Sequence, residues 1–433
     1  MMSEGTKQGE TERGNMNSSF SVQDSAFSTR PAAMAPFLEA ARQIAEGFWP
    51  QPLVECGKPI VAVLCNLAPL ELIHAAGAVP VRLCAGEIPG SRSTTDPLQS
   101  AIRNPQSAIP DAPRDLCHVV KGAAARLDAL KRQTGRPPAA VIVPSTCDWK
   151  SHCCGFLGLG DEARVLAVPR DKSSAGARRE WRRQIGDLAD FLVARTGTPI
   201  ARGPLLKSVM LYQQASRLGR RLADVMTQPV PPISGSDLML VFNLYYSLPV
   251  ETWMEAAAAL LDETRRGLSA GEDRRSPICP TRLLLAGAPI IWPHWSLPRL
   301  IESLGGAIVA DALCSSYRGF SDLVSMDETT RPALIEALAD RYLLPCTCPC
   351  FAPNEEYLWR VEKQADAFRV EGAIIHRLKN CYLYDMEAGR LEDLFRRRDL
   401  PCLQVETDYE SPAPAALTTR IETFLDLLRQ RRG

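Results

Sequence analysis

The chain has 433 residues, enough for two or three domains that each bury their own core. It has 50 Lys and Arg residues and 50 Asp and Glu residues, so no net charge favours nucleic acid or an anionic membrane as a partner. No run of about 18 uninterrupted apolar residues occurs, and the first residues lack the apolar stretch of a signal peptide. We therefore expect a soluble, cytoplasmic protein that binds neither nucleic acid nor membrane.

The cysteine content is high, with 14 cysteines in a chain that lacks an apparent export signal. Stable disulfides form mainly in exported proteins. Many cysteines in an intracellular chain are more typical of a metal or iron–sulfur site. The cysteines are therefore candidate metal ligands.

The first part of the chain predicts a disordered tail and then an α/β domain. Residues 1–34 form the tail, which is rich in Ser, Thr, Gly, Gln and Glu. The first α/β domain is assigned to residues 35–175. It contains a helix over 35–49, a strand over 60–65, a helix over 69–77 and a strand over 79–84. Strand, helix and strand at this spacing form a βαβ unit, which implies a parallel sheet.

The rest of this domain places two cysteines at the ends of elements. After a loop over 86–112, helical spacing resumes over 113–132, with Cys117 near its start. A strand then ends at Cys147, and another covers 165–169. Residues just past the carboxyl end of such strands line the ligand crevice of open α/β sheets. Cys147 is therefore predicted to lie where ligands bind.

The second half repeats the pattern after a helical region. Residues 176–275 are predicted as helices over 178–196, 204–227 and 252–268, with a break at 229–235. The second α/β domain covers 276–433, with strands over 281–287, 307–310, 372–378 and 400–406 and a final helix over 418–430. Cys381 follows the third of these strands. The fold class is therefore α/β, with two Rossmann-like, doubly wound sheets.

Three cysteines at element ends suggest a shared site. The macrodipole of the predicted helix and nearby Lys121 favour the thiolate of Cys117, the form that binds metal. Together with Cys147 and Cys381, it provides three thiolates from separate loops. Three thiolates suit a 4Fe-4S cluster with one open iron, because a complete set is normally four. A substrate can then bind at the open iron.

Other cysteines are assigned less directly. Cys346, Cys348 and Cys350 form a C-x-C-x-C pattern, which does not match the usual zinc spacing, so one of them is a further candidate ligand. Cys314 is another thiol at a strand end. The cysteines in or beside apolar runs are expected to be small core residues: Cys56, Cys65, Cys279 and Cys402. The adjacent Cys153 and Cys154 receive no assignment.

Several motifs resemble the 2-hydroxyacyl-CoA dehydratase and benzoyl-CoA reductase family, in particular the 2-hydroxyglutaryl-CoA dehydratase D-component type. They are Leu70–Cys84, Asp115–Cys117, Thr146–Asp148, Leu378–Cys381 and Gln404–Tyr409. The resemblance covers nearly everything after residue 55, and the joint occurrence of the motifs in this order is specific. It implies two flavodoxin-like domains with a helical region, and a 4Fe-4S cluster bound by Cys117, Cys147 and Cys381. It also implies that Glu71 is a catalytic residue near the substrate, although a surface acid in a first helical turn needs no such role.

The resemblance further implies an activity. The implied activity is that of a radical dehydratase, a lyase of anaerobic metabolism. In such an enzyme the cluster passes a low-potential electron to an acyl-CoA thioester. The resulting ketyl radical loses the 2-hydroxyl group, so that water is eliminated. Such an electron requires ATP, yet the chain contains no G-x-x-x-x-G-K-[ST] motif. The implied partners are a separate ATP-dependent iron–sulfur activator protein and a homologous second subunit, or a second copy of this chain.

Three alternatives remain open at this point. A double-cubane 8Fe cluster of a small-molecule reductase needs about six thiolates; Cys84, Cys314 and one of the C-x-C-x-C cysteines, such as Cys348, can supply the other three. A benzoyl-CoA reductase subunit reduces a ring instead of removing water. A subunit without catalysis can serve as an electron relay or scaffold.

Overall fold

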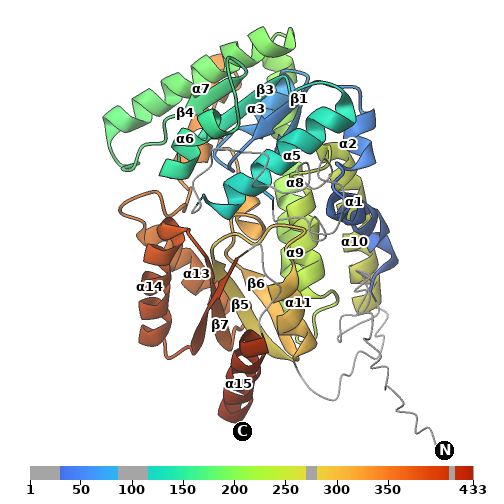
Figure 1. The fold of residues 1–433 in the computed structure, drawn as a ribbon, viewed down its shortest axis with the longest axis vertical. Helices are drawn as coiled ribbons and strands as arrows, with labels where there is room; N and C mark the ends of the chain where they lie inside the picture. The colour runs from blue at the N-terminus through green and yellow to red at the C-terminus, as the bar shows by residue number, and fades with distance from the viewer. Residues whose placement is uncertain (1–29, 86–115, 270–279, 409–414, 433) are drawn as a thin grey trace, which may run out of the picture.

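The computed structural model describes residues 30–85, 116–269, 280–408 and 415–432 (Figure 1). Most of the predicted tail, the predicted loop over 86–112 and Cys279 lie outside these residues. Of the tail, Ala32–Met34 form a short 3-10 helix, and Met34 is buried. No helix in the described part of the chain combines the length and apolar character that crossing a membrane requires.

The fold contains two four-stranded sheets, and every strand pair is parallel. The first sheet has the order β2-β1-β3-β4 and the second β6-β5-β7-β8. The strands of the first are β1 (Ile60–Val63), β2 (Val79–Arg82), β3 (Ala140–Pro144) and β4 (Ala163–Leu166). Those of the second are β5 (Thr281–Gly287), β6 (Gly306–Asp311), β7 (Gly372–Leu378) and β8 (Cys402–Thr407). The predicted α/β class with two parallel sheets is confirmed.

Both sheets share one doubly wound pattern, the order of flavodoxin-like folds. In each, the chain moves outward from the first strand to the second and then returns to the other side of the first. The order therefore reverses between β1 and β3, and again between β5 and β7. Figure 1 shows the two sheets in separate halves of the molecule, with helices around and between them.

The helices cover the sheets and fill the space between them. They are α1 (Ala35–Ala45), α2 (Gln51–Glu55), α3 (Leu70–Ala75), α5 (His118–Thr134), α6 (Asp148–Phe156), α7 (Ala175–Thr196), α8 (Arg202–Asp224), α9 (Gly235–Leu244), α10 (Val250–Ser269), α11 (Ser296–Ser303), α12 (Arg331–Leu343), α13 (Glu355–Ala367), α14 (Tyr382–Arg397) and α15 (Ala415–Arg432). Capping residues determine where several of these helices begin or end. The Ser174 and Thr330 side chains accept from backbone amides in the first turns of α7 and α12, and Gly197 ends α7 with a φ of 72°.

The two halves interlock through α12. This helix follows the second strand of the second sheet in the chain, yet it packs against α7 and α8. The indole nitrogen of Trp181 in α7 donates to the carbonyl of Ala339 at 2.9 Å, and Arg182 pairs with Asp340. The first helix, α1, likewise packs against α9. The helical layer therefore holds the sheets in a common frame.

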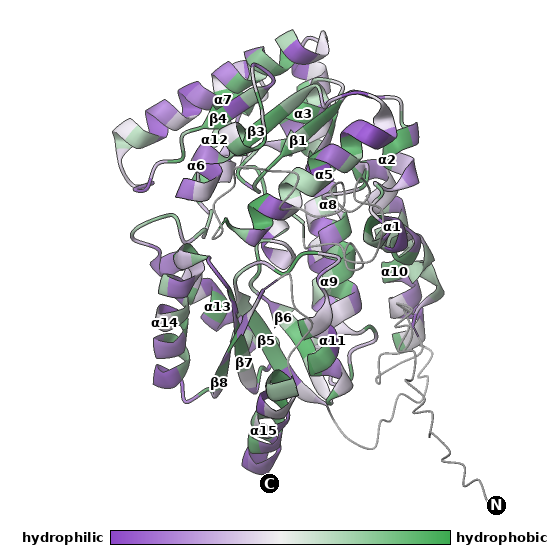
Figure 2. Ribbon diagram, in the orientation of Figure 1, coloured by the Kyte–Doolittle hydropathy of each residue, from purple (hydrophilic) through white to green (hydrophobic). Residues whose placement is uncertain are grey.

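The sequence patterns predict several helices and miss others. The expected helices over 178–196, 204–227, 252–268 and 418–430 are confirmed as α7, α8, α10 and α15. No helix was expected for α9, where the prediction has only the break at 229–235. Every residue of α9 is buried, so it lacks the alternating polar face on which helix prediction depends. Figure 2 shows α9 and the central strands as the hydrophobic interior, with polar faces on the outer helices such as α7 and α14.

An aromatic cluster joins the helical layer to the loop after β6. The ring of Phe320 lies 4.9 Å from that of Phe242, 4.7 Å from Tyr245 and 5.3 Å from Trp253, between centroids. These rings come from α9, the turn after it and α10. Phe320 itself is fully buried. The cluster therefore anchors the segment that follows Cys314.

We predict that Gly219→Ala destabilises the protein, because a Cβ at this position in α8 would lie 2.4 Å from the Phe320 ring. The gain in helix propensity, about 1 kcal/mol, is smaller than an overpacking cost of about 1–3 kcal/mol. Urea unfolding should show a net loss of stability. The matched control is Gly186→Ala in α7, where nothing lies within 4 Å and a gain is expected. A Gly219→Ala protein as stable as the control would contradict this packing.

Candidate functional site

A cavity of about 800 Å³ is lined by both halves of the molecule. Cys65 follows β1 and Cys147 follows β3, while Cys314 follows β6 and Cys381 follows β7. The strands β1, β3 and β7 flank the points where strand order reverses, which is where open α/β sheets bind ligands. The cavity therefore joins the ligand-binding edges of both sheets.

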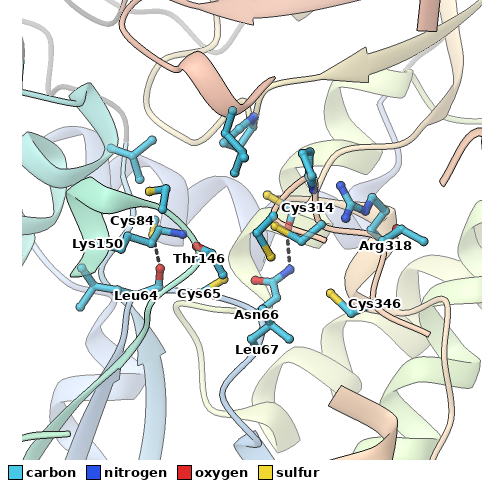
Figure 3. Close-up of a pocket in the computed structure, with 18 of the residues that line it drawn as sticks. Leu64, Cys65, Asn66, Leu67, Cys84, Thr146, Lys150, Cys314, Arg318 and Cys346 are labelled. Atoms are coloured by element: carbon cyan, nitrogen blue, oxygen red, sulfur yellow. Dashed lines mark hydrogen bonds between the residues drawn. The ribbon is translucent and has the colours of Figure 1, made fainter. Parts of the chain in front are cut away.

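A short polar chain connects the two edges inside this cavity. The Asn66 amide donates to the carbonyl of Cys314, as Figure 3 shows. Arg82, at the end of β2, donates to Asn66 Oδ1 at 2.6 Å and to the Cys314 carbonyl at 3.1 Å. The guanidinium also lies over the ring of Tyr246, 4.2 Å from its centroid. The loops after β1 and β6 are thus held together.

The three cysteines singled out from the sequence all line this cavity. Cys117, Cys147 and Cys381 are the N-cap residues of α5, α6 and α14. Two of these helices belong to the first half of the molecule and one to the second. The thiols are therefore brought together from three separate turns, each at the positive end of a helix dipole.

Burial opposes ionisation of these thiols. Burial raises the pKa of the Cys117 thiol to about 11. The Cys147 charge raises this pKa further, whereas the hydrogen bond from the Val119 amide lowers it. Burial, followed by the charges of Cys117 and Cys147, raises the pKa of Cys381 to about 12. The three thiols share one cavity. A metal that binds here has to displace their protons.

A second set of thiols lines the same cavity. We call it the second thiol group: Cys65, Cys84, Cys314, Cys346, Cys348 and Cys350. The Cys350 thiol donates to Cys348, which lowers the pKa of Cys348 to about 6. Burial and the neighbouring Cys348 raise the pKa of Cys346 to about 12. The Cys348 thiol therefore ionises more readily than an ordinary cysteine.

Cys65 was expected to be a small core residue, yet it lines the cavity. It packs partly against the core, so its apolar surroundings in the sequence were a true signal of burial. They carried no information on the cavity. Its charge interactions with Cys348 and Cys314 place it within the second thiol group. Cys402, also expected in the core, lies on β8 and is not among the cavity residues.

Two charged residues fix the loops that carry the second thiol group. Asp311, buried at the end of β6, accepts from the amide of Leu313 at 3.1 Å and from the hydroxyl of Ser316 at 2.7 Å. The Lys172 ammonium, from the loop before α7, donates to the carbonyls of Leu344 at 2.6 Å and Cys346 at 2.8 Å. The partners of Lys172 are distant in the sequence, so no local pattern indicated its role.

Glu71 lines the cavity too, and it is buried instead of lying on the surface of its helix. The Tyr342 hydroxyl donates to Glu71 Oε2 at 2.7 Å and accepts from the Leu70 amide at 3.1 Å. Because the amide occupies a lone pair, the hydroxyl proton is directed at the carboxylate. Burial raises the pKa of Glu71, while Arg341 and Tyr342 act in the opposite direction.

Hydroxyl groups without partners surround Glu71. Tyr212, Tyr245 and Ser216 are each less than a tenth exposed and line the cavity. Within the described residues, their hydroxyls make no hydrogen bond to another group. The Glu71 charge raises the pKa of both tyrosines, after the effects of burial and a neighbouring tyrosine. These hydroxyls line the cavity and can hydrogen-bond to its contents, so this wall suits a polar ligand or ordered water.

The donor set of the cavity fits an iron–sulfur cluster. Among the described residues, no three His, Cys, Asp or Glu side chains are arranged to hold a single metal ion. A cluster makes a different demand, because each thiolate binds a different iron atom. The ring of soft thiols, placed on turns of both halves, has the ligand type that iron–sulfur clusters require.

Comparison with known proteins identifies the family of the chain. The model of the family "2-hydroxyglutaryl-CoA dehydratase, D-component" matches residues 65–428. An Escherichia coli (strain K12) protein named "Putative dehydratase subunit YjiM" is 26% identical to the chain over 378 residues. That match covers 87% of this chain and 93% of the relative. The family region includes every cysteine that lines the cavity. The chain therefore belongs to the 2-hydroxyglutaryl-CoA dehydratase D-component family, as a dehydratase-type component.

Proposed function

We propose that this chain is the iron–sulfur subunit of a 2-hydroxyacyl-CoA dehydratase-type enzyme, with Cys117, Cys147 and Cys381 as the ligands of a 4Fe-4S cluster. The observation that carries the proposal is the convergence of these three thiols in one cavity. They come from three separate turns of both halves, and they influence one another's ionisation. Family membership supports the same reaction class.

The cluster and the protein have separate tasks in this proposal. When bound, the cluster would lend the thioester carbonyl of an acyl-CoA one low-potential electron, so that the 2-hydroxyl group could leave as hydroxide; loss of the β-proton and return of the electron would complete a redox-neutral removal of water. The protein excludes bulk water and transfers protons. Glu71 is the proposed proton-transfer group, since Tyr342 fixes one of its oxygens and burial raises its pKa towards the range useful in catalysis.

The partners follow from the same proposal. The chain supplies three ligands and no ATP-binding motif, so a separate ATP-dependent iron–sulfur activator provides the electron. A homologous subunit, or a second copy of the chain, completes the enzyme. Two exposed apolar residues of the cavity lining, Tyr382 (67% exposed) and Met386 (70%), lie on α14 just after Cys381. They are accessible to a substrate or a protein that approaches the cavity.

A second candidate function is favoured by the second thiol group. Its sulfurs share the cavity with the first three, so the chain has enough thiols for a double-cubane cluster. Cys84, Cys314 and Cys348 are the proposed additional ligands, and the lowered pKa of Cys348 suits metal binding. Such a protein would be a reductase of small molecules. Iron content separates the candidates, with about four atoms per chain for one cubane and about eight for two.

We predict that Cys147→Ala loses most of its iron after anaerobic reconstitution, because it removes one of only three thiolates. Iron analysis and EPR provide the measurement. Cys402→Ala, on β8 outside the cavity lining, serves as the matched control and should retain wild-type iron. Equal iron in the two variants would refute the ligand assignment. A wild-type protein without iron would refute the proposed function.

We predict that Tyr342→Phe destabilises the metal-free protein, because Glu71 Oε2 and the Leu70 amide lose a buried partner. Leaving buried polar groups unsatisfied costs about 1–3 kcal/mol. The Tyr342 hydroxyl favours ionised Glu71, so its removal raises the Glu71 pKa further. The loss of folding stability in Tyr342→Phe should therefore grow as the pH rises through the pKa of Glu71.

Urea unfolding of both proteins between pH 5 and 8 measures this effect. Tyr382→Phe is the control, because this side chain is 67% exposed and a change of less than about 0.5 kcal/mol is expected there. A difference between wild type and Tyr342→Phe that shrinks with rising pH would contradict the proposed role of the hydroxyl.

A further inference from the structure

Lys150 and Arg318 are two of the cations that line the cavity without a carboxylate partner. Lys150 lies in the first turn of α6, three residues after Cys147, and Arg318 lies four residues after Cys314. Among the described residues, no hydrogen bond or ion pair reaches the Lys150 ammonium. Arg318 donates to the Tyr384 hydroxyl at 3.4 Å, and its guanidinium lies 5.1 Å from the centroid of the Tyr357 ring. Figure 3 shows both cations among the sulfurs of the cavity.

The acidic residues of the cavity are engaged elsewhere. Glu71 is bound to Tyr342, and Asp322 pairs with Arg360 at 2.9 Å. Asp148, the remaining acid of the lining, is exposed at the start of α6. None of these three carboxylates therefore neutralises Lys150 by direct contact.

The groups that face Lys150 are thiols. Burial alone lowers its pKa, but the charges of Cys65, Cys84, Cys147 and Cys314 raise it well above the ordinary value. In turn, Lys150 lowers the pKa of Cys117 and Cys381 and that of Cys348. Lys150 lines the same cavity as the first three thiols and the second thiol group.

Lys150 is partly buried, and a partly desolvated cation without an anion beside it is destabilised. The cost disappears if the cavity contains an anion. A set of metal-bound thiolates is such an anion, and so is the sulfide of a cluster. The position of Lys150 among the thiols therefore indicates which anion it compensates, since the carboxylates that line the cavity engage other groups or face the solvent.

We propose that Lys150 is the charge-compensating residue of the iron–sulfur cluster and raises the potential at which the cluster accepts an electron. This inference rests on the proposed function. In the redox step, one electron from an external low-potential donor enters the cluster, whose negative charge increases by one, and no bond or proton need move. A fixed positive charge nearby stabilises the reduced form more than the oxidised form. Lys150 is a positioning residue in this scheme, because it acts through the cluster.

The test compares Lys150→Met and Lys150→Arg with the wild-type chain, each expressed in full and reconstituted anaerobically. Iron per chain is measured first, and the midpoint potential is then determined by EPR-monitored titration with dithionite and redox dyes. At the wild-type midpoint, the ratio of reduced to oxidised cluster should fall about tenfold in Lys150→Met, which corresponds to 59 mV for one electron. Lys150→Arg keeps the charge and should keep most of the potential.

Lys363→Met is the matched control. It removes the same charge from an exposed site on α13 that is not part of the cavity lining, where solvent and salt screen it. Its midpoint should equal that of the wild type.

The outcomes separate this inference from the proposed function. A wild type that binds iron while Lys150→Met keeps both its iron and its midpoint would overturn only the role of Lys150. Loss of iron in Lys150→Met but not in Lys150→Arg would support that role, since only the variant that keeps the positive charge keeps the cluster. Loss of iron in both variants would contradict the proposed charge compensation and indicate that Lys150 has a packing role. A wild type without iron would refute the proposed function itself.

Discussion

Desolvation of a ring of thiols is the constraint on which the rest of the structure depends. Burial keeps cysteines such as Cys117 and Cys381 protonated, whereas metal binding requires thiolates. The fold counters this effect with backbone amides at helix N-termini and with the ammonium of Lys150. The protein therefore provides, in advance, part of the electrostatic stabilisation that an anionic cluster needs.

Such a cavity also requires that two separate sheets keep a constant relative position. The helical layer provides this, because α12 packs on α7 and Trp181 and Arg182 bind its backbone and side chains. Closer to the site, Asn66 and Lys172 connect loops of the first half to carbonyl groups beside thiols of the second. All of these contacts lie within one chain. The relative position of the thiols is thus set by the fold of the single subunit.

The sequence predicted those parts of the site that depend on local pattern. Alternating strands and helices indicated two parallel sheets, and cysteines just after strands were expected at the ligand-binding edge, where the structure has them. What it could not indicate depends on contacts between distant residues. Cys65 looked like a core residue, and α9 has no polar face because other elements surround it. Lys150 and Tyr342 become informative only through the groups that face them.

The same burial affects the two ends of the cavity differently, and this difference suits a reaction that moves both electrons and protons. Around the thiols, Lys150 favours negative charge. Around Glu71, burial favours the neutral acid, although Tyr342 and Arg341 limit the effect. The cavity thus favours negative charge around the thiols and the protonated acid around Glu71. Because a single cavity contains both, a ligand that spans it can contact both groups.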